Sequence, residues 1–493
     1  MKPPESAART VIPIAVSKDT SPISPPEGAS PVLVSLYEAH QKIYPRSVSG
    51  RFARLRWAMV FFTQLLFYGL PWLHWGERQA VLFDLAARRF YIFKLVLYPQ
   101  DFIYLTGLLV ISALSLFLFT AVAGRLWCGY ACPQTVYTEI FMWIERKTEG
   151  DRIAHMRRDE GAWSWDKLWR KSLKQVLWLA VGLWTGFTFV GYFTPIHVLA
   201  AEVANWSFGS WEIFWVLFYG FATYGNAGYM REQVCMHMCH YARFQSAMFD
   251  KDTLIVTYDS ERGEPRGSRS KKADFAALNL GACVDCSLCV QVCPTGIDIR
   301  KGLQYECIGC GACADVCNTV MDKVGYARDL VKFSTQHAME NHWTSVQTMR
   351  HIFRPRVLIY TGILLLVTAL LFGSLLTRKS FKVDVVRDRA SLARIVSGGH
   401  IENVYRLQIM NAAEKRQHFH IIASGMHDLK VMTDSEDLLV ESTQSRWVSV
   451  RLQVPYDAAV PGSYPIQFTI EAFDDHEKSS EKLEEKSVFL MPR

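Results

Sequence analysis

Five long apolar stretches without charged side chains divide this chain of 493 residues. They run from Trp57 to Gly76, Phe102 to Gly124, Gln175 to Ala201, Ile213 to Met230 and Val357 to Thr377. Each is long enough to cross the roughly 30 Å hydrocarbon core of a bilayer as a helix, and Trp and Tyr at their ends are typical of membrane interfaces. A buried core helix would explain one such stretch but explains five poorly. We therefore predict a bundle of five membrane-spanning helices.

The Lys and Arg residues between these stretches predict the orientation of the chain. Four arginines, at positions 46, 51, 54 and 56, precede the first stretch, and ten basic residues lie between Arg125 and Lys174. The connection from Glu202 to Glu212 has no Lys or Arg, although basic residues also occur in the first external loop and after Arg378. By the positive-inside rule the N-terminus is expected in the cytoplasm, and five spans place the C-terminus on the opposite, periplasmic side.

After the fifth stretch the pattern changes from long apolar runs to alternation. Apolar residues occur at every second position in the segments 448–454 and 466–470, and in 401–409 with Asn403 as the one polar exception. This period, interrupted by Gly, Pro and Asp, is typical of antiparallel strands. About 110 residues with about seven such strands predict an all-β immunoglobulin-like sandwich.

Composition completes the expected organisation. Residues 1–31 are rich in Pro, Ser and Ala, which favours a disordered tail without a secretory signal. The net charge of +7 is spread over loops, so nucleic acid is not an expected partner. The predicted domains are a cytoplasmic tail (1–45), four membrane helices (46–234), an α+β ferredoxin-like two-cluster domain (235–355), a fifth helix (356–378) and the periplasmic sandwich (379–493).

Eight of the twelve cysteines form two quartets with the spacing C-x2-C-x2-C-x3-C. The quartets are Cys283, Cys286, Cys289 and Cys293, then Cys307, Cys310, Cys313 and Cys317. This spacing is that of bacterial ferredoxins with two 4Fe-4S clusters, in which the fourth cysteine of each motif binds the other cluster. We therefore predict one cluster on Cys283, Cys286, Cys289 and Cys317, and a second on Cys307, Cys310, Cys313 and Cys293. Two structural zinc sites are the alternative, but zinc motifs rarely carry four cysteines at this spacing.

The other four cysteines form two C-x3-C pairs, Cys128 with Cys132 and Cys235 with Cys239. On a helix this spacing places both sulfurs on one face, and the duplication suggests that the pairs meet in one site of four thiolates. Such a soft site favours Cu(I), Zn or an iron–sulfur cluster, whereas four buried structural cysteines are the alternative. His237 and His240 flank the second pair and are further candidate ligands, although each is also explained as a polar residue at a helix end. His74 and His197 are interpreted as interfacial residues.

Three segments, LYEAHQKIYPRSVSGRFARLRW, RLWCGYACPQTVYTEIFMWIERKTEGDR and YARFQSAMFDKDTLIVTYD, resemble the FixG/CcoG family of cytochrome oxidase accessory proteins. The resemblance extends from about Leu36 to the C-terminus. It implies a polyferredoxin of the bacterial inner membrane that acts as a cupric reductase and supplies Cu(I) for assembly of cbb3-type cytochrome c oxidase. It also implies copper at the four C-x3-C cysteines and, as partners, oxidase subunits or copper chaperones and transporters. The sequence departs from the expected pattern at His240, where Pro is usual.

Two other functions remain open at this stage. The chain resembles polyferredoxin subunits that relay electrons from quinol or a soluble donor to a partner, and it could be a scaffold for oxidase assembly without catalysis. Copper binding at the four thiolates or quinol oxidation would distinguish these functions. The electron donor is unknown, and a homodimer is among the expected assemblies.

Overall fold

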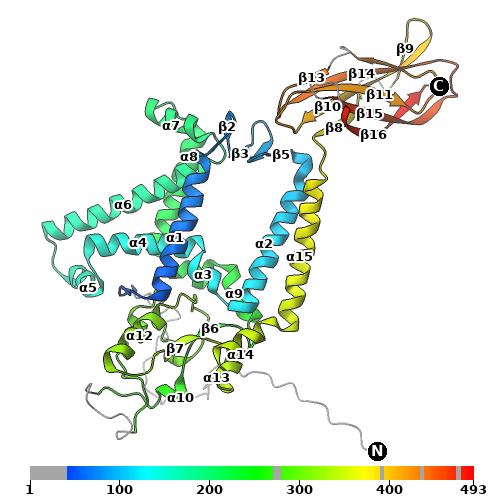
Figure 1. Cartoon of the computed structure of the whole chain (residues 1–493). Helices are drawn as coiled ribbons and strands as arrows, with labels where there is room; N and C mark the ends of the chain where they lie inside the picture. The colour runs from blue at the N-terminus through cyan, green and yellow to red at the C-terminus, as the bar shows by residue number, and fades with distance from the viewer. Residues whose placement is uncertain (1–41, 270–278, 389–392, 434–437, 474–478, 493) are drawn as a thin grey trace, which may run out of the picture. The chain divides into compact units, whose positions relative to one another are not determined.

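The computed structural model describes residues 42–269, 279–388, 393–433, 438–473 and 479–492 (Figure 1). The chain divides at Lys42, and the account below concerns the unit from Ile43 to Arg493. The predicted disordered tail therefore lies almost wholly outside the described residues. The domain boundaries stay predictions.

The helices follow the apolar segments and the cysteine motifs. The α-helices are α1 (Arg51–Gly69), α2 (Phe102–Ala123), α3 (Leu126–Tyr130), α4 (Pro133–Glu149), α5 (Arg152–Glu160), α6 (Trp165–Val190), α7 (Ile196–Asn205), α8 (Ser210–Gly225), α9 (His240–Met248), α10 (Ser260–Gly263), α11 (Leu288–Gln291), α12 (Ala312–Val324), α13 (Gln336–Glu340), α14 (Ser345–Arg350) and α15 (Pro355–Leu376). Short 3-10 turns are η1 (Leu70–Trp72), η2 (Pro99–Asp101), η5 (Ile299–Lys301) and η6 (His351–Phe353), and π-helical turns are η3 (Asn226–Met230) and η4 (Val234–Met238).

The strands form two short sheets between α1 and α2 in the chain (β1-β2 and β3-β4-β5), a two-stranded sheet beside the cysteine quartets (β6-β7), and a C-terminal sandwich. They are β1 (His74–Trp75), β2 (Arg78–Gln79), β3 (Val81–Asp84), β4 (Arg89–Ile92), β5 (Leu95–Leu97), β6 (Ile255–Tyr258), β7 (Val331–Ser334), β8 (Phe381–Arg387), β9 (Arg394–Val396), β10 (His400–Asn411), β11 (Gln417–Ser424), β12 (Lys430–Thr433), β13 (Leu438–Val440), β14 (Ser445–Pro455), β15 (Gly462–Phe473) and β16 (Ser479–Met491).

Three helices in the described part of the chain are long and apolar enough to cross a membrane, fewer than the five predicted. They are Pro99–Ala123, which includes α2, together with α6 and α15. The predicted first span, α1, carries three arginines in its first six residues and ends at Gly69, and the predicted fourth span, α8, has only 16 residues. The predicted third span is displaced, because α6 begins at Trp165 and ends at Val190.

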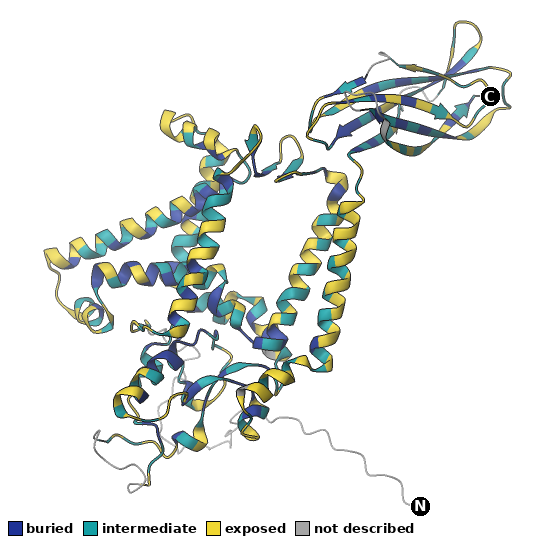
Figure 2. Ribbon diagram, in the orientation of Figure 1, coloured by how far each residue is buried: buried dark blue, intermediate teal, exposed yellow. Residues whose placement is uncertain are grey.

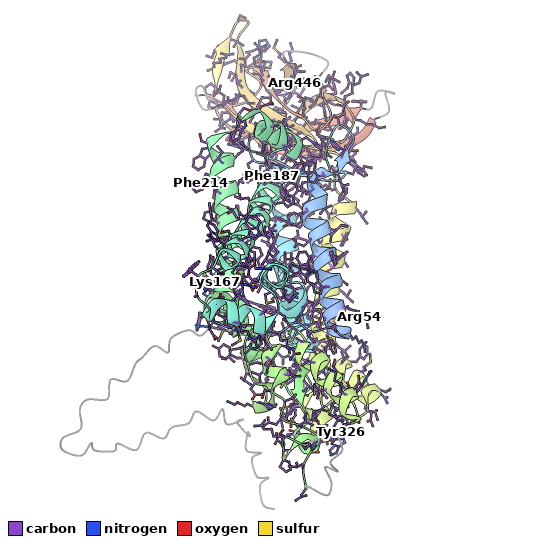
Figure 3. The ribbon with its side chains drawn as sticks, turned by 90° about the vertical axis from the view of Figure 1, so that its left-hand side faces the viewer. Arg54, Lys167, Phe187, Phe214, Tyr326 and Arg446 are labelled. Carbon is purple, nitrogen blue, oxygen red and sulfur yellow. The ribbon has the colours of Figure 1, made fainter. Side chains whose placement is uncertain are left out.

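Exposure of apolar side chains marks the surfaces that face lipid (Figure 2). In α2 and α15, almost no part of the most apolar 18-residue segment is buried. In α6, 39% of the corresponding segment is buried inside the protein. The helices α2 and α15 pack against each other at Gly107, where a Cβ would lie 2.7 Å from Cδ1 of Leu371. Figure 3 shows that labelled basic side chains (Arg54, Lys167) and labelled aromatic ones (Phe187, Phe214) lie at different heights along the helices.

The segment with both cysteine quartets is closed by the antiparallel pair β6 and β7, in which Ile255 faces Ser334 and Tyr258 faces Val331. Between these strands lie α11 and α12, each of which carries cysteines. The buried carboxylate of Asp315 on α12 accepts hydrogen bonds from the backbone N–H groups of Phe52 and Ala53 in the first turn of α1. The carboxylate thus satisfies two unpaired donors of that helix and joins it to the quartet segment.

The C-terminal region is the predicted sandwich. One sheet has the order β12-β14-β10-β8, with β9 paired to β10, and the other has the order β13-β11-β15-β16. The alternating segments of the sequence form β10, β14 and β15, and their inward residues, including Ile401, Val450 and Phe468, are fully buried between the sheets. The period-two pattern therefore predicted both the strands and their inner faces.

Candidate iron–sulfur and thiolate site

Four cysteines from both quartets line one cavity. Cys283, Cys286, Cys289 and Cys317 surround it, together with Tyr258 and Arg300. The chain turns sharply around this cavity, because Asp285 and Ser287 adopt left-handed backbone angles, with φ of 52° and 56°. Cys317 reaches the cavity from α12. This is the set that the sequence assigns to the first cluster, and its role in ligation stays a prediction.

The remaining cysteines of the quartets line a second, adjacent cavity. Its wall contains Cys293, Cys307, Cys310 and Cys313, and Cys289 lies between the two cavities. Gly309 and Gly311 have φ of +66° and +73°, a conformation that glycine adopts without strain, and they let the loop turn between its cysteines. The fourth cysteine of each quartet, Cys293 or Cys317, thus lines the cavity formed by the first three cysteines of the other quartet. The two-cluster ferredoxin spacing requires this exchange.

The chemistry of both cavities fits 4Fe-4S clusters. Burial raises the pKa of the Cys317 thiol to about 12, and burial raises that of Cys289 to about 11. Burial and neighbouring thiols also raise the pKa of Cys313 well above its ordinary value. These thiols would be uncharged at neutral pH on their own, so holding them as thiolates requires a cationic group. An iron–sulfur core supplies that charge and takes four thiolates.

The two cavities differ in their access to water. Cys286 is exposed, whereas Cys310 in the second cavity is buried. Arg300 lies beside the first cavity and pairs with Asp298 at 2.8 Å and with Asp285. The first cavity therefore reaches solvent at Cys286, although Cys283 on its wall is buried, whereas none of the cysteines that line the second cavity is exposed.

The two C-x3-C pairs adopt one local structure twice, and it is not the continuous helix that the spacing predicts. Cys128 lies in the short helix α3, and Cys132 is the N-cap of α4 with φ −61° and ψ 129°. Cys235 lies in the π-helical turn η4, and Cys239 is the N-cap of α9 with φ −78° and ψ 104°. Each pair is thus a helical turn followed by a cysteine that begins the next helix, where a thiolate is favoured by the helix dipole.

The departure at His240 leaves this geometry unchanged. Pro133 and His240 each occupy the first position of the helix that follows the second cysteine of a pair. The N–H at that position has no intrahelical partner, so proline is favoured there but not required.

The structure brings the two pairs together. Burial raises the pKa of Cys128 to about 12, and Cys132, Cys235 and Cys239 lie close enough for their charges to raise it further. Cys128 Sγ also donates a hydrogen bond to the buried Gln245 Oε1 at 3.5 Å. We call these four cysteines the thiolate quartet.

The sulfurs of the thiolate quartet are near one another, but no three of them lie within 4.8 Å of one another. In the part of the chain that the structure describes, three donor atoms within 4.8 Å of one another occur only at Glu149, His155 and Asp159. The thiolate quartet is therefore more open than a closed tetrahedral site for a single ion. His237 and His240 are exposed, and neither belongs to such a donor group.

The thiolate quartet lies against the second cluster cavity. A Cβ at Gly129, between the first two cysteines, would lie 2.8 Å from the carbonyl oxygen of Ile308 and 3.1 Å from Cα of Cys310. The Tyr130 hydroxyl donates a hydrogen bond to the Cys310 carbonyl oxygen at 3.3 Å. Cys128 packs against a group of buried apolar side chains that includes Cys310. Only a glycine permits this approach of backbone to backbone.

Sequence reasoning missed two groupings of histidine. His74 and His197 were interpreted separately, but their rings stack with centroids 4.6 Å apart. His155 Nε2 lies 2.6 Å from the Glu149 carboxylate and 3.6 Å from that of Asp159. His74 and His197 are far apart in the sequence, so no motif could have predicted that their rings meet. Glu149 and His155 are close in sequence, so their contact could have been predicted from the short turn between α4 and α5.

The Glu149 group is a network of ion pairs. Lys174 Nζ lies 3.1 Å from Glu149, and Lys171 Nζ lies 2.7 Å from Asp159, so cations already neutralise both carboxylates. Burial raises the pKa of Glu149, but the hydrogen bond with His155 and the charge of Lys174 outweigh it and lower the pKa to about 2.

Glu149→Gln is expected to destabilise the protein at neutral pH by about 3 kcal/mol, the usual result of breaking a buried ion pair. The pKa of Glu149 is lower in the folded chain than its ordinary value of 4.5, so this stabilisation is complete above pH 4.5 and lost as the pH falls towards 2. Unfolding in detergent at pH 7 and at about pH 3 should show a difference from wild type that shrinks at the lower pH. An equal difference at both would contradict the ionised state assigned to Glu149.

Known protein families match the regions of the chain that contain the cysteines and the C-terminal sandwich. A family described as "4Fe-4S dicluster domain" matches residues 230–336, one described as "4Fe-4S binding domain" matches residues 105–149, and the IG-like fold at the C-terminal of FixG matches residues 371–492. The nitrogen fixation protein FixG of Rhizobium meliloti is 39% identical over 79% of this chain and 80% of its own length. The chain belongs to the FixG family.

Two further proteins are similar to this chain over different lengths. Protein RdxB of Cereibacter sphaeroides is 38% identical over 82% of this chain and 87% of its own length. The crystal structure of a FixG-related protein from Vibrio parahaemolyticus covers 23% of this chain and 97% of its own, with 23% identity and a TM-score of 0.20. The family models and the identity with FixG, rather than that structure, show that the chain is an iron–sulfur redox protein of the FixG family with apolar helices and a C-terminal IG-like domain.

Proposed function

We propose that this protein is a membrane-bound iron–sulfur oxidoreductase that reduces Cu(II) to Cu(I) for assembly of a cbb3-type cytochrome c oxidase. The observation that supports it most is the contact of the thiolate quartet with the second cluster cavity, where Gly129 meets the backbone of Ile308 and Cys310. A soft thiolate site beside a one-electron carrier suits both the reduction of copper and the retention of Cu(I).

In this proposal electrons enter at the first cluster cavity and leave from the second. Cys286 marks the exposed end, Cys289 lines both cavities, and Cys310 packs against Cys128 of the thiolate quartet. One electron passes from the second cluster to Cu(II), which becomes Cu(I) and stays bound to sulfur. The open spacing of the sulfurs admits the ion from water before they close around it.

The test is a copper titration of the reduced protein. Anaerobic protein is reduced with dithionite, freed of reductant and mixed with Cu(II), and Cu(I) is measured with a colorimetric chelator. The two clusters hold one electron each, so about two Cu(I) per chain are expected, with loss of the reduced-cluster EPR signal. Clusters that stay reduced beside unreacted Cu(II) would contradict the proposal.

One observation favours the electron-relay alternative. The "4Fe-4S binding domain" match at residues 105–149 includes Cys128 and Cys132, and an open set of four sulfurs suits a cluster better than a single ion. In that case the thiolate quartet would hold a third cluster and pass electrons to a partner. Iron analysis distinguishes the two, because copper reduction at an empty quartet predicts about eight iron atoms per chain and a third cluster predicts about twelve.

The proposal also includes the orientation of the protein in the membrane and its binding partners. We propose that the clusters face the cytoplasm and the IG-like domain the periplasm, since basic residues flank the cluster side of the helices. We also propose that the IG-like domain binds oxidase subunits or copper chaperones and transporters.

A further inference from the structure

A buried cation lies where the two C-x3-C pairs meet the second cluster cavity. Arg125 is the N-cap of α3, three residues before Cys128, and it is only 5% exposed. Its guanidinium donates a hydrogen bond at 2.5 Å to the carbonyl oxygen of Ala242 on α9, three residues beyond Cys239. The side chain therefore joins the two segments that carry the thiolate quartet.

Arg125 also adjoins the second cluster cavity. A Cβ at Gly309, two residues after Cys307, would lie 3.4 Å from the carbonyl oxygen of Arg125 and 3.7 Å from its Cβ. Burial raises the pKa of Cys307 in that cavity and of Cys128 and Cys235 in the thiolate quartet. At each of these thiols the positive charge of Arg125 partly offsets the rise in pKa. One guanidinium thus acts on both sites.

The charge of Arg125 has no carboxylate partner among the described residues. No Asp or Glu oxygen there lies within 4.0 Å of its guanidinium. The buried Glu232, whose charge also acts on Cys235, is not within this distance. An arginine keeps its charge inside a protein, and a buried charge without a partner is strongly destabilising. The thiolates around Arg125 are the anions that can balance it.

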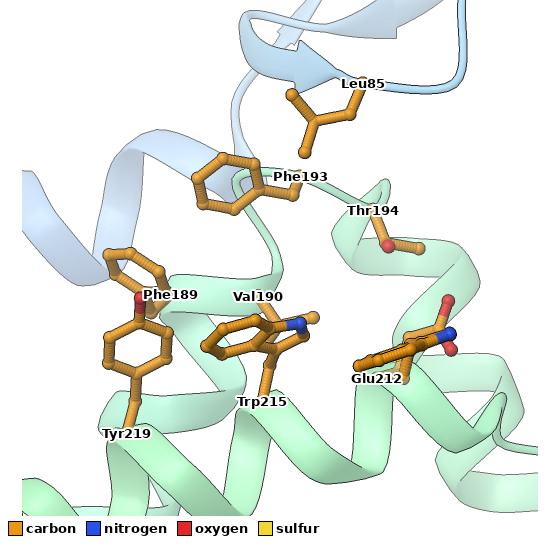
Figure 4. A pocket seen from close by; sticks show the side chains of 9 residues that line it. Leu85, Phe189, Val190, Phe193, Thr194, Glu212, Trp215 and Tyr219 are labelled. Carbon is orange, nitrogen blue, oxygen red and sulfur yellow. The ribbon is translucent and has the colours of Figure 1, made fainter.

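Charged groups beside the other cavities are neutralised or reach water. Arg56 acts on the second cluster cavity at Cys310 but lies 3.6 Å from Glu139. Arg300, beside the first cluster cavity, has two carboxylate partners. Glu212 lines a separate cavity of about 300 Å³ between α6 and α8, which no cysteine lines, and its side chain is partly exposed (Figure 4).

We propose that Arg125 is the counter-ion shared by the thiolate quartet and the second cluster, and that its charge raises the reduction potential of that cluster. A cluster gains negative charge when it accepts an electron, and a fixed cation in a buried site favours that form. The higher potential draws the electron towards the thiolate quartet. Arg125 is a positioning residue: its effect on the cluster rests on the two-cluster assignment, and its effect on copper rests on the proposed function.

The test is a redox titration of the full-length protein in detergent, with the reduced clusters detected by EPR. Arg125→Gln removes the charge and is expected to lower the midpoint potential of one cluster while the other stays unchanged. Arg125→Lys keeps the charge and should restore the wild-type value, which a purely structural role would not predict. Arg300→Gln is the control, because that arginine has its own carboxylates beside the first cavity. It should leave the potential that Arg125→Gln lowers at its wild-type value.

Three results would overturn the inference. The first is equal potentials in wild type and Arg125→Gln. The second is an equal fall in Arg125→Gln and Arg125→Lys, which would show that the shape of the side chain matters and its charge does not. The third is loss of iron from both variants. Loss of iron from Arg125→Gln alone would support the inference, because a cation would then be needed to hold the cluster thiolates.

Cu(I) binding tests the thiolate quartet separately. In an anaerobic competition with a Cu(I) chelator, Arg125→Gln is expected to bind Cu(I) about tenfold more weakly than wild type, the effect that a nearby opposite charge has on ionisation. Arg125→Lys should bind as wild type does. Equal affinity in wild type and Arg125→Gln would overturn the role of Arg125 at the quartet. A wild-type protein that binds no Cu(I) would instead contradict the proposed function, and the shift in potential would still decide the role of Arg125 at the cluster.

Discussion

Replacing Cys128 and Cys132 together by Ser is expected to abolish copper reduction while both clusters remain. The two sulfurs supply half of the thiolate quartet, and Cys128 packs beside Cys310 without lining either cluster cavity. A serine hydroxyl is a hard, neutral ligand and does not retain Cu(I) as a thiolate does. The clusters should keep their EPR signals and about eight iron atoms, and Cu(I) formation should fall to the level of protein without clusters.

His237→Ala is the control for this variant. His237 lies between the two cysteines of the second pair in sequence, but its side chain is exposed, whereas all four cysteines are partly buried, so copper reduction should be retained. Unchanged copper reduction in the double serine variant would contradict the assignment of the thiolate quartet. Loss of iron from that variant would show that the pair binds a cluster and would favour the electron relay.

Gly129→Ala is expected to interrupt transfer between the second cluster and the thiolate quartet. The added methyl would lie 2.8 Å from the Ile308 carbonyl oxygen, closer than van der Waals contact allows, and both neighbours are backbone. The two segments must move apart, at a cost of about 1–3 kcal/mol in the free energy of unfolding. Dithionite should still reduce the clusters, whereas their reoxidation by Cu(II) should slow.

Gly225→Ala is the matched control, since a Cβ there meets no atom within 4 Å. The same substitution at the end of α8 should leave stability and copper reoxidation close to wild type. Equal reoxidation rates in the two variants would show that the contact at Gly129 does not carry the electron path.

The parts of the structure that sequence predicted well have short-range patterns. Alternation at Ile401 to Ile409 is imposed by strand geometry itself, so β10 and its inner face could be predicted directly. The exchange of Cys293 and Cys317 between cavities follows from the number of residues between cysteines. Apolar runs of sufficient length predicted α2 and α15 because a lipid-facing helix needs little tertiary support.

The parts that sequence could not predict depend on tertiary contacts. α1 contains arginines that would be costly in lipid, but Arg56 is buried 3.6 Å from Glu139, so its position is decided by another helix. The spacing of Cys235 and Cys239 predicts one helix face, whereas a π-helical turn ends between them.

The most direct test of the account follows clusters and copper together by rapid freeze-quench EPR. Dithionite-reduced protein, freed of reductant, is mixed with Cu(II), and the reduced-cluster and Cu(II) signals are recorded over time. The account predicts that the two signals disappear at the same rate, one electron per copper, and that the double serine variant of Cys128 and Cys132 shows neither loss. Reduced clusters that persist while the Cu(II) signal stays unchanged in the wild-type protein would contradict it.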